Sequence, residues 1–169
     1  MAETVVVGID GSTDSAAALR WALDYAGQRA ANVRVVHVWT PVPWYEELSR
    51  DQQQELECDR ARSAEQAAKR TAETLRALKV APADVEASVV EGAPGTALVE
   101  VSRDAALLVV GATGRGGADS GNTSRVGATA RYVTRHAICP VTVVSHDRQP
   151  ELAEVLRYRV VPVPATACS

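Results

Sequence analysis

The chain has 169 residues, a length that suits one domain with a sizeable buried core. Hydrophobic residues make up 46% and charged residues 23%, which is a globular balance and excludes wholesale disorder. The formal net charge of −3 argues against a basic surface that would bind nucleic acid. The apolar runs are too short to cross a bilayer. The N-terminus lacks the basic-then-apolar layout of a signal peptide. We therefore expect a cytoplasmic protein with no nucleic-acid or membrane partner.

Strand-like and helix-like patterns alternate along the chain. Residues 4–9 are a continuous apolar run, as in a strand buried on both faces of a parallel sheet. Residues 10–14 supply turn residues and a helix N-cap. Apolar side chains at helical spacing then predict a helix over 13–30, ended by Asn32. A second strand is predicted over 33–39.

The second half of the chain repeats this alternation. A long polar helix is predicted over 46–78, with a few candidate inward positions at Leu56, Ala64, Ala67, Ala68 and Leu75. Alternating residues predict a third strand over 85–90, and Pro94 marks the start of a short helix that runs to about Ser102. The remaining predicted elements are a strand over 107–110, a helix over 126–136 and a strand over 141–144.

The three cysteines, Cys58, Cys139 and Cys168, are widely scattered and form no CxxC pair. No histidine lies at metal-ligand spacing from them. We interpret them as structural thiols in a reducing compartment, with no metal site.

Strands that alternate with helices require crossover connections, which are right-handed in nearly all cases. The sequence therefore predicts an α/β fold with a doubly wound, five-stranded parallel sheet and helices on both faces. Ligands of such sheets bind outside the carboxyl ends of the strands. Asp10, Val38 and Gly111 are each predicted at such an end.

The glycine loop, residues 111–117, directly follows the predicted strand 107–110. Glycine tolerates positive φ and lets an anion approach the main chain, so the loop is suited to hold phosphate, although an ordinary surface loop has similar glycine content. The Asp10 carboxylate can accept hydrogen bonds from ribose hydroxyls, and Val38 can cover a purine face. Together these features indicate a nucleotide. The loop matches neither the P-loop nor the dinucleotide-binding fingerprint.

At residue level the chain resembles the universal stress protein family over roughly residues 3–145. The resemblance is carried by separated motifs in the same order: Val-Gly8-Ile-Asp10-Gly-Ser12, His37-Val38, Val90-Glu-Gly92-Ala-Pro94, Leu-Val-Val-Gly111-Ala-Thr-Gly114-Arg-Gly-Gly and His136-Ala-Ile-Cys-Pro140-Val. It implies a Rossmann-like fold of the adenine nucleotide alpha hydrolase type, with strand order 3-2-1-4-5, and a homodimer formed through the last strand. It also implies a regulatory module of the stress response.

Family members either bind ATP or lack the site, and binding members share a pattern similar to Gly-x2-Gly-x9-Gly-Ser/Thr. Gly111 and Gly114 match its first half. Its second half falls on Gly127-Ala128, with twelve intervening residues instead of nine and an alanine where a hydroxyl is expected. The resemblance thus implies ATP or another adenine nucleotide, with or without Mg²⁺, or else a degenerate empty site. The residues implied for nucleotide binding are Gly8, Asp10, Val38, Gly111, Gly114, Arg115, Gly116, Gly127, Ala128 and Thr129.

Several alternatives stay open at this point. Asp10 is either a ligand of the nucleotide or the N-cap of the first helix, while His37 and His136 are expected to be structural. Nothing in the sequence assembles a nucleophile with a base, so no enzyme activity beyond slow ATP hydrolysis is expected. A dimeric interaction protein without a ligand is the alternative function. We expect a domain over 1–145 and an extension over 146–169 that forms either an extra edge strand or a disordered tail.

Overall fold

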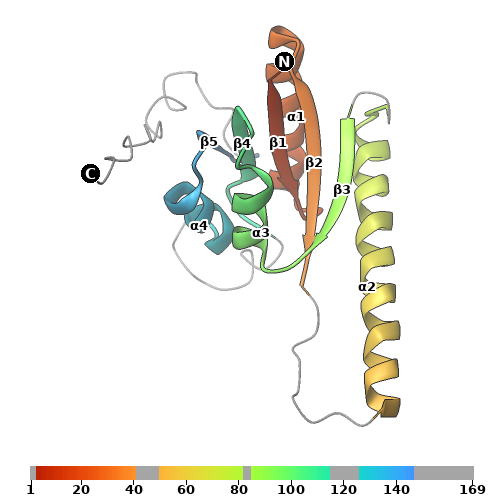
Figure 1. The fold of residues 1–169 in the computed structure, drawn as a ribbon. Coiled ribbons are helices and arrows are strands. Elements are labelled where there is room, and N and C mark those ends of the chain that lie inside the picture. The colour runs from red at the N-terminus through yellow and green to blue at the C-terminus, as the bar shows by residue number, and fades with distance from the viewer. Residues whose placement is uncertain (1–2, 41–49, 82–84, 115–125, 147–169) are drawn as a thin grey trace, which may run out of the picture.

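The computed structural model describes residues 3–40, 50–81, 85–114 and 126–146, and contains a five-stranded parallel sheet (Figure 1). The strand order is β3-β2-β1-β4-β5, and every neighbouring pair is parallel. The predicted fold class and strand order are therefore confirmed. The strands are β1 (Thr4–Ile9), β2 (Asn32–Trp39), β3 (Val85–Glu91), β4 (Leu107–Gly111) and β5 (Val141–Val144).

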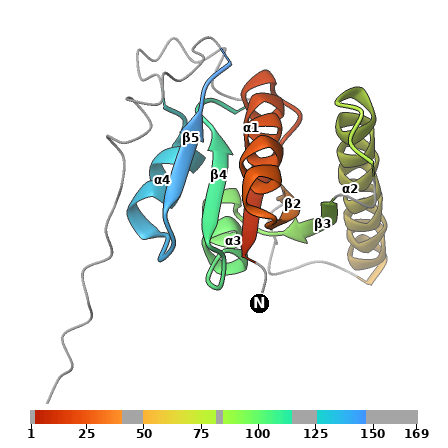
Figure 2. The same ribbon diagram turned by 90° about the horizontal axis from the view of Figure 1, so that it is seen from above.

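Helices cover both faces of the sheet, as Figures 1 and 2 show from two directions. They are α1 (Thr13–Arg29), α2 (Arg50–Ala77), α3 (Pro94–Val101) and α4 (Ala128–His136). Side chains of α1 and α2 pack with one face, whereas α3 and α4 pack with the other. This is the doubly wound arrangement that crossover connections between parallel strands produce.

The core explains why β1 is apolar at nearly every position. Val5 and Val7 point to the face covered by α1, whereas Val6 points to the face covered by α3 and α4. All three side chains are fully buried. A strand buried on both faces cannot alternate apolar with polar residues, so its sequence is a continuous apolar run.

The ends of α1 differ in detail from the sequence prediction. Its N-cap is Ser12, whose side-chain oxygen accepts a hydrogen bond from the Ser15 amide, so Asp10 is not the cap. Its C-cap is Ala30, which adopts the left-handed conformation at φ 52° and ψ 38°. Asn32 does not end the helix but begins β2. An alanine in this conformation gives no sequence signal, because glycine or asparagine usually fills that position.

Helix α2 lies along β2 and β3 and continues well beyond the end of β3 (Figure 1). Of its predicted inward positions, Ala67 is buried and Leu56, Ala64 and Leu75 are half-buried, but Ala68 is exposed. Thr71 takes the second buried position because its hydroxyl lies 3.0 Å from Nδ1 of His37. His37 thus contacts α2 and also lines the cavity described below, and its structural role stays a prediction. No helix in the described part of the chain is both long and apolar enough to cross a membrane.

Candidate functional site

A cavity of about 740 Å³ opens at the carboxyl ends of the strands. Asp10, Val38 and Gly111, predicted to converge from three separate strands, all line it. Its size is within the range of small-molecule sites. The cavity also contains every other predicted site residue that falls within the described part of the chain: Gly8, Gly114, Gly127, Ala128 and Thr129. Arg115 and Gly116 lie outside the described residues.

The glycine turn, residues 111–114, forms one wall of the cavity. Neither Gly111 nor Gly114 has a positive φ, so conformational freedom is not the reason for glycine here. A Cβ on Gly111 would lie 2.8 Å from both the carbonyl carbon of Asp14 and the amide nitrogen of Ser15. Gly111 is thus required because the turn packs directly against the backbone of α1.

The Asp10 carboxylate serves both the local fold and the cavity. Its Oδ1 accepts a hydrogen bond of 2.9 Å from the amide of Ser12, which shapes the turn into α1. Gly11 adopts φ +80° within this turn, a conformation that favours glycine. The other oxygen, Oδ2, faces the glycine turn, since a Cβ on Gly114 would lie 2.8 Å from it. One oxygen of Asp10 therefore stabilises the turn into α1, while the other faces the glycine turn that forms a wall of the cavity.

The N-terminus of α4 forms the wall next to the glycine turn. Gly127 is the N-cap and has no side chain to accept a hydrogen bond from the helix, while its own amide donates to the carbonyl of Ala112 at 2.7 Å. Residues from Gly127 to Arg131 line the cavity. A helix N-terminus without a side-chain cap presents amide hydrogens and a partial positive charge, which suit an anion. Arg131 adds a formal positive charge to this wall.

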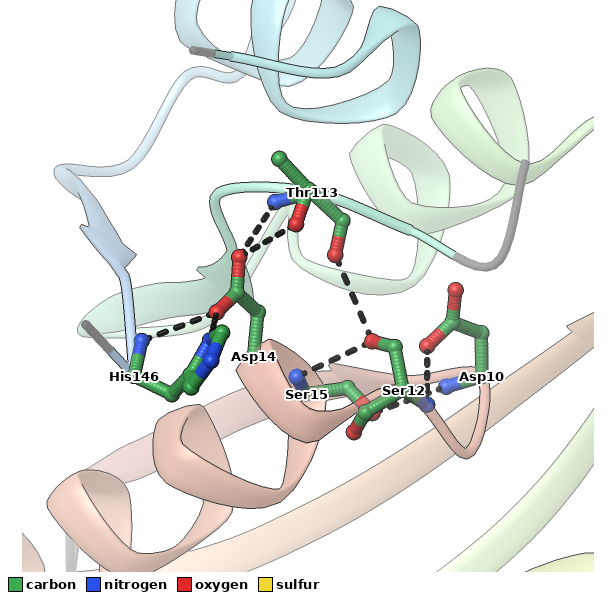
Figure 3. A network of polar contacts seen from close by, with 6 residues as sticks. All are labelled: Asp10, Ser12, Asp14, Ser15, Thr113 and His146. Carbon is green, nitrogen blue, oxygen red and sulfur yellow. Dashed lines mark hydrogen bonds and ion pairs between the residues drawn. The ribbon is translucent and has the colours of Figure 1, made fainter. Parts of the chain in front are cut away.

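A network of hydrogen bonds connects the glycine turn to the start of α1 and to His146 (Figure 3). Oδ2 of Asp14 accepts hydrogen bonds from the amide and the hydroxyl of Thr113, at 2.8 and 2.6 Å. Oδ1 of Asp14 accepts from the amide of His146 at 2.8 Å and pairs with its Nδ1 at 2.5 Å. On the other side of the turn, the Ser12 hydroxyl donates to the carbonyl of Thr113 at 3.3 Å.

Asp14 is almost fully buried, with a side-chain exposure of 2%. Burial alone would raise its pKa, but hydrogen bonds from His146 and Thr113 outweigh burial and lower the pKa below its usual value. The Asp14 carboxylate is therefore ionised at neutral pH. An ionised carboxylate only accepts hydrogen bonds, so Nδ1 of His146 must be the donor.

The sequence analysis did not identify this network. Asp14 lies four residues before Ala18 and eight before Ala22, so helical periodicity places it on the buried face of α1. A charged residue on a buried helical face is a signal for a specific partner. The partner itself was not predictable, because 132 positions separate Asp14 from His146.

Polar residues on α2 also line the cavity without having been predicted. Ser63, Gln66 and Arg70 line it from α2, which packs against β2 and β3. Their signal was hidden because a long polar helix offers many similar residues, most of which are solvated. The cavity therefore has polar groups on α2 as well as at the strand ends.

The described cysteines and acidic residues give no sign of a metal centre. Cys139 is a buried free thiol whose pKa is raised by burial, and Cys58 is an exposed free thiol on α2. Within the described ranges, no group of three or more His, Cys, Asp or Glu side chains is placed to hold a metal ion. His136, also expected to be structural, lies at the end of α4 with its Nδ1 2.8 Å from the carbonyl of Tyr132.

The fold and its cavity define an α/β protein with a ligand-sized site at the carboxyl edge of a parallel sheet. The model of the universal stress protein family matches residues 1–145. The chain belongs to the universal stress protein family.

Curated relatives support this assignment. The chain is 35% identical over 144 residues to universal stress protein Rv2624c of Mycobacterium tuberculosis, a match that covers 84% of the chain and 48% of the relative. It is 33% identical over 150 residues to universal stress protein Mb2028c of Mycobacterium bovis, covering 85% and 48%. The chain thus spans about half the length of the curated relatives it matches.

Solved structures of the family share the fold. Universal stress protein UspA from Lactobacillus plantarum matches with a TM-score of 0.68 and 23% identity, over 84% of this chain and 97% of that chain. A universal stress protein solved in complex with cAMP matches with a TM-score of 0.51 and 28% identity, over 84% and 95%.

Proposed function

We propose that this protein is a nucleotide-binding regulatory module of the stress response, and that its ligand is ATP or another adenine nucleotide. The observation that carries the proposal is the convergence of three chemistries on one cavity. Asp10 supplies a carboxylate, Val38 an apolar side chain, and residues 127–131 the N-terminus of α4 next to the glycine turn. These match the ribose, base and phosphate of a nucleotide, respectively.

We infer the orientation of the nucleotide from where these groups lie. The phosphates are placed at Gly127 and the glycine turn, where uncapped amides and Arg131 favour negative charge. The base is placed toward Val38 at the end of β2, and the ribose hydroxyls donate to Asp10. The solved family member in complex with cAMP, which carries an adenine base and a phosphate, supports this ligand class.

A thermal-shift series on the full chain tests the proposal. A ligand present at a hundred times its Kd adds about 2.7 kcal/mol, which raises Tm by roughly 5–10 °C for a chain of this size. ATP, ADP or AMP is expected to give such a shift at millimolar concentration. No shift with any of the three would favour the alternative, an interaction protein without a ligand.

Asp10→Asn is the informative variant in this series. The asparagine retains one carbonyl oxygen for the Ser12 amide, so the turn is preserved, but an NH₂ group replaces the second acceptor. We expect nucleotide affinity to fall at least about tenfold with little change in the Tm of the free protein. Asp24→Asn is the matched control, since Asp24 is exposed on α1 and does not line the cavity.

We further propose a cytoplasmic homodimer formed through β5. The last strand lies at one end of the sheet order and pairs with β4 among the described strands, which leaves an edge suited to a second copy. Light scattering of the full chain is expected to give twice the monomer mass of 17.9 kDa. A monomer mass at high micromolar concentration would contradict this proposal.

A further inference from the structure

The buried Asp14 is ionised yet lies outside the cavity. Neither Asp14 nor His146 is among the residues that line the cavity, whereas Thr113, to which Asp14 is bonded, does line it. Burying a carboxylate is costly unless every oxygen finds donors. Here each oxygen of Asp14 accepts two hydrogen bonds, and the donors to the two oxygens come from two different segments of the chain.

The two segments are the glycine turn and the chain just after β5. Oδ2 holds Thr113, and Oδ1 holds His146, which follows β5 by two residues. Figure 3 shows Asp14 between them. The imidazole of His146 is 47% exposed, so this end of the network is accessible from solvent.

Thr113 is held at all of its polar atoms. Its amide and hydroxyl bond Asp14, and its carbonyl accepts from Ser12. Ala112 next to it donates to Val144 of β5 at 2.7 Å and accepts from Gly127 at 2.7 Å. The position of the glycine turn is thus set by hydrogen bonds to side chains at the start of α1 and to the backbone of β5 and Gly127.

From this geometry we propose that Asp14 and His146 are positioning residues for the glycine turn, and that His146 affects nucleotide affinity through Asp14. His146 donates to Asp14, Asp14 orients Thr113, and Thr113 places the amides of the turn against the phosphates. The last step rests on the proposed function, whereas the first two rest on hydrogen bonds within the chain itself.

Two substitutions of His146 distinguish the effect of losing its hydrogen bond to Asp14 from the effect of losing the imidazole ring. His146→Ala removes the side-chain donor, whereas His146→Asn places an amide NH₂ near the position of Nδ1 and can restore the bond. In the ligand-free protein, we expect the amide NMR resonances of Thr113 and Gly114 to move in the alanine variant and to return toward wild type in the asparagine variant. Nucleotide affinity should fall about three- to tenfold in the alanine variant and recover in the asparagine variant.

The outcomes distinguish this inference from the proposed function. Unchanged Thr113 and Gly114 resonances in His146→Ala would overturn it, as would equal changes in both variants. If the resonances move and recover but wild-type protein binds no adenine nucleotide, the positioning role stands and the proposed function fails. A Tm measurement on each variant verifies that the comparison is between folded proteins.

Discussion

Gly111→Ala is expected to lower Tm by roughly 2–12 °C and to weaken nucleotide binding at the same time. The added Cβ would lie 2.8 Å from two backbone atoms of α1, at Asp14 and Ser15, and 3.0 Å from the Asp14 Cβ. Backbone cannot rotate away as a side-chain tip can, so β4 and α1 must separate. Overpacking of this kind costs about 1–3 kcal/mol, and each kcal/mol lowers Tm by about 2–4 °C.

Gly27→Ala is the control for this substitution. Gly27 lies within α1, and a Cβ there would meet nothing within 4 Å. Alanine is more favourable than glycine by up to about 1 kcal/mol in a helix, and Gly27 lies in the last turn of α1, so this variant is expected to be at least as stable as wild type. Thermal unfolding followed by circular dichroism measures both variants. If Gly111→Ala were as stable as wild type, the close packing of the turn on α1 would be contradicted.

Ala128→Ser is expected to tighten the binding of phosphate-bearing nucleotides about ten- to hundredfold. Ala128 is the first residue of α4, lines the cavity and is exposed. It stands where the family pattern has a serine or threonine. A hydroxyl at this position can donate to a phosphate oxygen, and a hydrogen bond to a charged group contributes about 1.5–3 kcal/mol.

The ligand series shows whether the gain arises at the phosphate. Calorimetric titration with AMP should show the tighter binding, whereas adenosine, which has no phosphate, should bind the variant and wild type alike. Ala68→Ser is the matched control, because Ala68 is exposed and is not among the α2 residues that line the cavity. An equal gain for adenosine would place the phosphate elsewhere.

Much of the site could be predicted because a parallel sheet brings the carboxyl ends of its strands to one edge. Apolar runs identified the strands, and Asp10, Val38 and Gly111 followed from where those runs end. This reasoning needs only local patterns and one topological rule. It is therefore accurate for residues on strand ends that are far apart in the sequence.

Contacts between residues far apart in the sequence could not be predicted from local patterns and topology. Gly111 was expected to serve an approaching anion, but its need for glycine arises from the backbone of α1. Helical periodicity marks Asp14 as a buried acidic residue, but only the three-dimensional structure brings its partner His146 to it. Such pairs depend on the relative placement of α1, β4 and β5, which no single segment encodes.

Calorimetric titration of the unmodified full chain with ATP and AMP, beside CTP and CMP, tests the central claim most directly. We expect one adenine nucleotide to bind per chain, and the cytosine nucleotides to bind more weakly, because Val38 and the β2 side of the cavity offer a surface for a purine. Equal binding of cytosine and adenine nucleotides would contradict an adenine site. Absence of binding by all four at millimolar concentration would contradict a nucleotide site altogether.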